Sequence, residues 1–211
     1  MSAPLVTITR QYASGGSDIA LLAAQQLDWT LIDNEFVEQV ARRAGVPRDE
    51  VAQREERAPG LLERLARTLA VASPEMFITT AGVPRVEEDE ATIVKVTERV
   101  IREAAAQGRA VLVGRGAQAV LAQRDHALHV YIVAPKPWRV KLAVERLGVD
   151  AARVEKAVDE VDQQRDHYVK TYFGRARQDV SNYDLVLNSE RLGIDGAAAV
   201  IVAEVRRRRW E

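Results

Sequence analysis

Short apolar runs alternate along the chain with longer segments in which apolar residues recur every three or four positions. The runs predict strands at residues 6–9, 29–32, 110–113, 128–133 and 184–187. The helical periodicity predicts helices at residues 17–27, 35–44, 90–107, 138–147, 151–172 and 195–209. The run at 110–113 is apolar on both faces, which is typical of a central parallel strand. Strands that alternate with helices favour one α/β domain, a parallel sheet covered on both faces.

A loop of small residues, Ala13-Ser14-Gly15-Gly16-Ser17, separates the first predicted strand from the first predicted helix. Backbone N–H groups converge at such a loop and the helix dipole favours negative charge, so the pattern indicates an anion site. The nucleotide-binding P-loop, G-x-x-x-x-G-K-[ST], has a lysine and a hydroxyl where this chain has Ser17 and Asp18. The nearest cation along the chain is Arg10. The alternative is a tight turn that needs small residues only for packing.

A second glycine loop, Gly114-Arg115-Gly116, follows the apolar run at 110–113. Ligands of open α/β sheets bind at the carboxyl ends of the strands, so both loops are expected at the same edge. An arginine between two glycines can present two N–H groups to a phosphate. The alternative is an arginine that pairs with a structural carboxylate.

The predicted helix at 151–172 is rich in charge and carries Arg165 and Lys170. A mobile basic lid that closes over a triphosphate would have this composition. A solvated helix held by pairs of aspartate and arginine is the alternative and is the commoner case.

Composition narrows the classes of function. The 211 residues carry 30 Lys and Arg against 31 Asp and Glu, so no excess charge points to a nucleic-acid polymer or a membrane surface. Cysteine is absent, which excludes disulfides and thiolate chemistry, and the three histidines lack metal-ligand spacing. No export signal is read at the N-terminus, and no apolar run approaches the roughly 20 residues that span a bilayer. We therefore expect a cytoplasmic protein.

Five segments together resemble the cytidylate kinase-like family, a branch of the P-loop nucleoside monophosphate kinases. They are Ile8-Thr9-Arg10-Gln11-Tyr12-Ala13-Ser14-Gly15-Gly16, Leu31-Ile32-Asp33, Val111-Leu112-Val113-Gly114-Arg115-Gly116-Ala117, residues 162–172 and Asn182-Tyr183-Asp184-Leu185-Val186-Leu187-Asn188. The resemblance runs from about residue 5 to about residue 205, and the spacing between the segments is more specific than any one of them.

The resemblance implies a three-layer P-loop NTPase fold, with about five parallel strands flanked by helices. Residues 1–211 would form one domain, with an acceptor-side helical region at 34–108 and a lid-like helical region at 137–180. The implied reaction is ATP-dependent phosphorylation of CMP or dCMP with Mg²⁺.

The resemblance also implies roles for individual residues. The donor phosphates of ATP would lie on Ser14, Gly15, Gly16, Ser17 and Asp18. The acceptor would be bound by Asp33, Gly114, Arg115 and Gly116. The charge of the transferring group would be neutralised by Arg10, Arg115, Arg165 and Lys170. The metal ligands stay open, with Asp18 and Asp33 as the candidate carboxylates.

Three alternatives remain. The first is a nucleotide-binding regulatory module with weak or no catalysis, which the missing P-loop lysine would explain. A kinase for a different small acceptor would have the same motifs. An interaction protein built on the same sheet is the third, and the leucine-rich face at residues 61–69 could then pack on the core or on a second copy in a homodimer.

Overall fold

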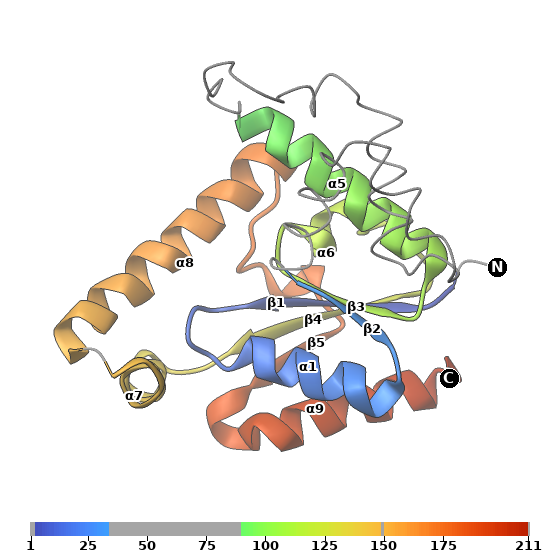
Figure 1. Cartoon of the computed structure of the whole chain (residues 1–211). Helices are drawn as coiled ribbons and strands as arrows, with labels where there is room; N and C mark the ends of the chain where they lie inside the picture. Colours follow the sequence, from blue (N-terminus) through green and yellow to red (C-terminus); the bar gives the residue numbers. More distant parts are fainter. Residues whose placement is uncertain (1–2, 34–89, 149, 211) are drawn as a thin grey trace, which may run out of the picture.

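Five parallel strands form the centre of the fold in a computed structural model that describes residues 3–33, 90–148 and 150–210 (Figure 1). The strands are β1 (Leu5–Arg10), β2 (Thr30–Ile32), β3 (Ala110–Val113), β4 (Ala127–Val133) and β5 (Leu185–Asn188). They lie in the order β2-β3-β1-β4-β5, and every neighbouring pair is parallel. In the central strand, Ile8 is in register with Val113 on one side and with Val130 on the other. The predicted parallel α/β sheet is confirmed.

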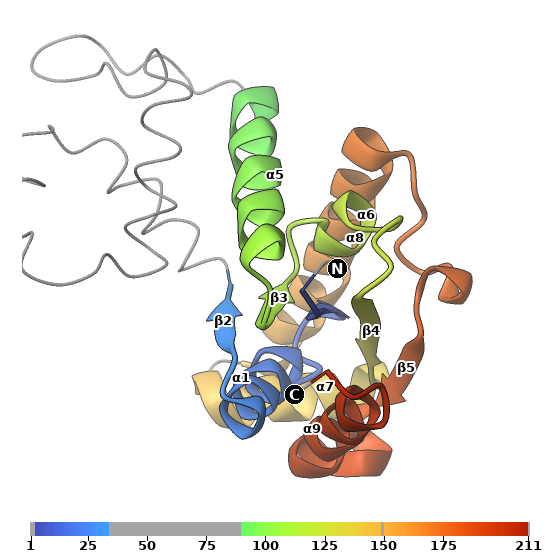
Figure 2. The same ribbon diagram turned by 90° about the vertical axis from the view of Figure 1, so that its right-hand side faces the viewer.

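Helices cover both faces of this sheet. They are α1 (Gly16–Leu27), α5 (Glu90–Gln107), α6 (Ala117–Val120), α7 (Lys136–Leu147), α8 (Ala151–Phe173) and α9 (Ser189–Arg207), with a short 3₁₀ helix η2 (Val180–Asn182). Both views place α1 and α9 together on one face and α5 and α6 on the other (Figure 2). None of the helices in the described ranges is long and apolar enough to cross a membrane.

Alternate residues of the central strands feed two separate cores. Val6 and Ile8 point into the core shared with α1 and α9, whereas Leu5 belongs to the core shared with α5 and α6. On β3, Val111 and Leu112 divide in the same way. This alternation explains why β3 is apolar at every position, since it buries both of its faces.

A third, smaller cluster connects the glycine loop to the α7–α8 pair. Ala143, Val154 and Val158 are buried between these two helices, and Tyr12 and Ala13 of the loop after β1 pack against them. The loop is therefore attached to α7 and α8 as well as to the sheet.

Several predicted boundaries were wrong, and each has a local cause. Helix α9 begins at Ser189, six residues before its predicted start, because Asn188 caps it by accepting hydrogen bonds from two backbone N–H groups. Gly193 has φ 69° and interrupts the helical backbone, which hides the helical period before it. Helix α7 begins at Lys136, two residues before its predicted start, because Pro137 fits the first turn, where a missing N–H costs nothing.

The bounds predicted for α5 and β3 are confirmed, whereas α6, with four residues, is too short to show a period. The predicted helix at 35–44, the leucine-rich face at 61–69 and most of the acceptor-side region at 34–108 lie outside the described residues.

Candidate functional site

The connections after β1 and β3 leave the sheet in opposite directions. The chain after β1 enters α1 on one face, and the chain after β3 enters α6 on the other. Because β1 and β3 are neighbours, their carboxyl ends form the crevice in which ligands of open α/β sheets bind. A cavity of about 670 Å³ opens here, bounded by both strand ends, α6 and α8. Its lining includes Thr9, Arg10, Gly114, Arg115, Gly116, Gln118, Arg165, Tyr168, Arg177 and Tyr183.

Arg10, at the end of β1, turns toward the second glycine loop. Gly114 has φ 73°, and a Cβ atom there would lie 1.8 Å from Arg10 Nη1, so a side chain at this position would strain the backbone and displace the guanidinium. The Arg10 carbonyl accepts hydrogen bonds from Arg165 Nη1 at 3.1 Å and from Arg177 Nη1 at 3.0 Å. Three arginines from three parts of the chain thus meet at the end of one strand.

The electrostatics of this cluster favour an anion. Burial, together with repulsion from Arg165, Arg177 and Arg115, lowers the pKa of Arg10 to about 10, while Asp33 acts in the opposite direction. Burial also lowers the pKa of Arg165. Arg10 Nε is buried without a hydrogen-bond partner. Gathered guanidinium groups with an unused donor are suited to bind phosphate or carboxylate oxygens.

Arg177 lies in the predicted lid-like region at 137–180 but was not among the predicted site residues. It comes from the segment after α8, its side chain is 3% exposed, and it donates to Asp166 at 2.5 Å while pairing with Asp162 at 3.4 Å. The two aspartates are four residues apart, which places both carboxylates on one face of α8. That spacing was visible in the sequence and could have indicated a basic partner for this face.

The first glycine loop is closely packed. Gly15 has φ 74°, and a Cβ atom there would lie 2.2 Å from Ile194 Cδ1; at Gly16 it would lie 2.5 Å from Arg10 Cβ. Ser14 is buried, and its hydroxyl donates to the Gln11 carbonyl. A side chain at Gly16 would therefore collide with the root of the Arg10 side chain, and one at Gly15 would displace the Ile194 side chain. The N-terminus of α1 nevertheless has no side-chain cap, so its first N–H groups keep their capacity to bind an anion.

The structure thus places the predicted site residues in two groups. The cavity is lined by Arg10, Gly114, Arg115, Gly116 and Arg165, whereas Ser14, Gly15, Gly16, Ser17 and Asp18 are not part of its lining. Asp33, just past the end of β2, acts electrostatically on Arg10.

Asp18 and Lys170 lie outside this cavity. Asp18 Oδ2 accepts a hydrogen bond from Arg146 of α7 at 2.5 Å. Lys170 is exposed on α8 and does not line the cavity. Within the described ranges, no group of three acidic or histidine side chains could hold a metal ion by itself.

Two comparisons support these observations through sequence. The model of the "Cytidylate kinase-like family" matches residues 5–191. A cytidylate kinase from Methanopyrus kandleri is 30% identical over 129 residues, which cover 57% of this chain and 67% of that protein.

Solved structures share the fold. An uncharacterized protein from Eubacterium ventriosum superposes with a TM-score of 0.67 at 20% identity, covering 96% of this chain and 98% of that chain. Shikimate kinase from Acinetobacter baumannii, in complex with shikimate, gives a TM-score of 0.53 at 11% identity, covering 99% and 96%. The family match and the kinase fold support a nucleotide kinase, which is a phosphotransferase. With a family model that spans nearly the whole chain, this protein belongs to the cytidylate kinase-like family.

Proposed function

We propose that this chain transfers the γ-phosphoryl group of ATP to a nucleoside monophosphate, CMP or dCMP, with Mg²⁺. The observation that carries the proposal is the meeting of Arg10, Arg115 and Arg165 in one cavity at the carboxyl edge of β1 and β3. The choice of cytidylate as acceptor draws support from the family match and from the M. kandleri cytidylate kinase.

The arginine cluster would bind the acceptor phosphate and then the transferring group. Phosphoryl transfer needs positioning and neutralisation of charge more than covalent help. The Arg10 carbonyl accepts hydrogen bonds from Arg165 and Arg177, and its guanidinium lies against Gly114, so the strand end from which the guanidinium extends is preorganised. Preorganised donors of this kind stabilise charge that develops in the transition state.

The donor phosphates would lie on the backbone of Ser14, Gly15, Gly16, Ser17 and Asp18. The uncapped N-terminus of α1 fits a polyphosphate because its N–H groups are not used by a side chain. A bound Mg²⁺ would supply positive charge that neutralises the donor phosphates. Asp18 and Asp33 are the carboxylates proposed to hold it, and a site with one or two carboxylates plus phosphates is usual for this ion.

The α7–α8 region, which corresponds to the lid expected at 137–180, is proposed to cover the reacting groups and exclude water. Arg165 already reaches the Arg10 carbonyl from α8. Lys170, one and a half turns further along α8, would need a shift of that helix or a long reach to join it.

A coupled assay for ADP release with ATP, Mg²⁺ and a panel of monophosphates tests the proposal. We expect turnover with CMP and dCMP above that with UMP, AMP and GMP. Nucleotide binding without ADP release from any acceptor would favour the regulatory module. Turnover with another acceptor alone would support kinase activity but contradict CMP and dCMP as the acceptors.

A further inference from the structure

The first glycine loop lacks a cation of its own. Ser17 stands where a P-loop lysine would contact the donor phosphates. Arg10, the nearest cation along the chain, is directed away from the loop, with its guanidinium against Gly114. The positive end of α1 is thus left without a positively charged side chain from its own loop.

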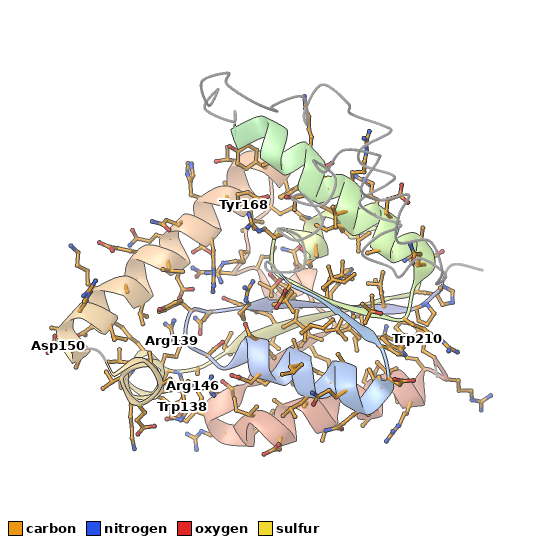
Figure 3. All side chains as sticks on the ribbon, in the orientation of Figure 1. Trp138, Arg139, Arg146, Asp150, Tyr168 and Trp210 are labelled. Carbon is orange, nitrogen blue, oxygen red and sulfur yellow. The ribbon has the colours of Figure 1, made fainter. Side chains whose placement is uncertain are left out.

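The structure brings another arginine to this position. Arg146, in the last turn of α7, places Nη1 2.5 Å from Asp18 Oδ2 in the first turn of α1. Asp18 Oδ2 is in turn 3.9 Å from the position that a Cβ atom would take on Gly15, the N-cap of α1. The guanidinium therefore lies next to the start of α1, and Figure 3 shows Arg146 on the side of α7 that is turned toward α1.

Both members of this pair are accessible to a ligand. The side chain of Arg146 is 46% exposed and that of Asp18 is 43% exposed. An exposed ion pair contributes little to stability, so its partners can exchange at low cost. A guanidinium can bind phosphate oxygens through two parallel hydrogen bonds, whereas Asp18 is bonded to Arg146 through one nitrogen. A polyphosphate also carries more negative charge than a single carboxylate.

We propose that Arg146 supplies the cation that the glycine loop lacks, and that it binds the polyphosphate of the donor nucleotide. Asp18 holds the guanidinium beside α1 while no polyphosphate is bound, and it competes with the polyphosphate for that guanidinium. The inference rests on the proposed function for the place of the donor, and it adds a residue from α7 to that place.

Two substitutions separate this role from a structural one because they break the same ion pair. Arg146→Gln removes the phosphate ligand, so we expect it to weaken the binding of ATP and of inorganic tripolyphosphate about tenfold. Asp18→Asn leaves the guanidinium and removes a repulsive charge, so we expect it to tighten the binding of both severalfold. The measurement is isothermal titration calorimetry on the full chain, with each probe alone and without Mg²⁺, because Asp18 is also proposed to hold that ion.

Lys141→Gln is the matched control. Lys141 is also on α7, is 75% exposed and, within the described part of the chain, pairs with Glu145 of its own helix, so its loss changes the net charge equally and should alter binding less than twofold. Opposite shifts for Arg146→Gln and Asp18→Asn, with Lys141→Gln unchanged, support the inference. Unchanged or equally weakened binding in the two variants overturns it while the proposed function stands. A wild-type chain that binds neither probe overturns both.

Discussion

Arg139 and Tyr12 are joined both directly and through the carboxylate of Asp162. Arg139 Nη1 donates to Asp162 Oδ2 at 2.7 Å and to the Tyr12 carbonyl at 3.0 Å, while the Tyr12 N–H donates to Asp162 Oδ1 at 2.9 Å. Arg177 completes the network from the other side of Asp162. Helices α7 and α8 are thereby fixed to the loop after β1. A lid movement that carries both helices away from this loop would have to break the buried network.

Asp162→Ala should destabilise the fold. The substitution leaves Arg139 and Arg177 buried without their shared carboxylate, and removal of one partner from a buried pair costs about 3 kcal/mol. Urea unfolding measures the free energy. Asp159→Ala is the control on the same helix, because Asp159 pairs with Lys136 at the surface and its loss should leave the unfolding midpoint in place. Equal effects of the two substitutions would contradict the structural role given to Asp162.

Arg115→Ala should reduce turnover strongly while the protein stays folded. If Arg115 stabilises the transferring group, its loss costs about 3 kcal/mol, or roughly a hundredfold in kcat/KM. The coupled assay measures the rates, and circular dichroism checks the fold. Arg102→Ala, which removes an exposed arginine of α5, serves as control. Unchanged turnover in Arg115→Ala would remove this residue from the mechanism.

Gly116→Ala should be more harmful than Gly148→Ala, although both glycines have positive φ. The values are 71° and 63°, so each substitution incurs backbone strain of about 1 kcal/mol. A Cβ atom at Gly116 would also lie 2.3 Å from Phe173 Cε2, whereas nothing lies within 4 Å at Gly148. We expect about 2 kcal/mol more loss at Gly116 in urea unfolding, because the ring must move. Similar losses at both positions would show that the Phe173 ring, at the end of α8, moves aside at little cost in stability.

His129 should make stability depend on pH. Burial lowers its pKa from the ordinary value of 6.5, and its Nδ1 lies 2.7 Å from Thr7 Oγ1. In the unfolded chain this histidine therefore takes up a proton near pH 6.5, whereas in the folded chain it does so only at lower pH. The stabilisation is present above pH 6.5 and is lost as the pH falls toward the folded pKa, by up to about 1.4 kcal/mol per pH unit. His129→Gln should flatten this slope in unfolding measured between about pH 7.5 and 5.5, and an unaltered slope would refute it.

The elements with a strong local signal were predictable. The 90–107 helix has an uninterrupted apolar face, and the 110–113 strand is apolar throughout, so their bounds agree with α5 and β3. The start of α9 was not predictable from period alone, because Gly193 breaks the helical backbone just where the pattern would begin. The parallel order of strands followed from their alternation with helices.

The residues that line the cavity were partly predictable. Parallel strands end at one edge, so residues that follow β1 and β3 had to lie near each other, and Arg10, Gly114 and Arg115 do line one cavity. The direction of each side chain was not predictable. Arg10 is the cation nearest to the first glycine loop along the chain, yet its guanidinium lies against the second loop.

The sequence by itself determined the sheet, the two glycine loops and the edge at which they meet, because periodicity and glycine positions act through the neighbouring backbone. Only the tertiary structure decided which charges pair. Arg146 reaches Asp18 across 128 positions of chain, and Arg177 reaches the Arg10 carbonyl across 167. Such partners are chosen by the packing of α7 and α8 on the sheet, and no local pattern encodes that distance.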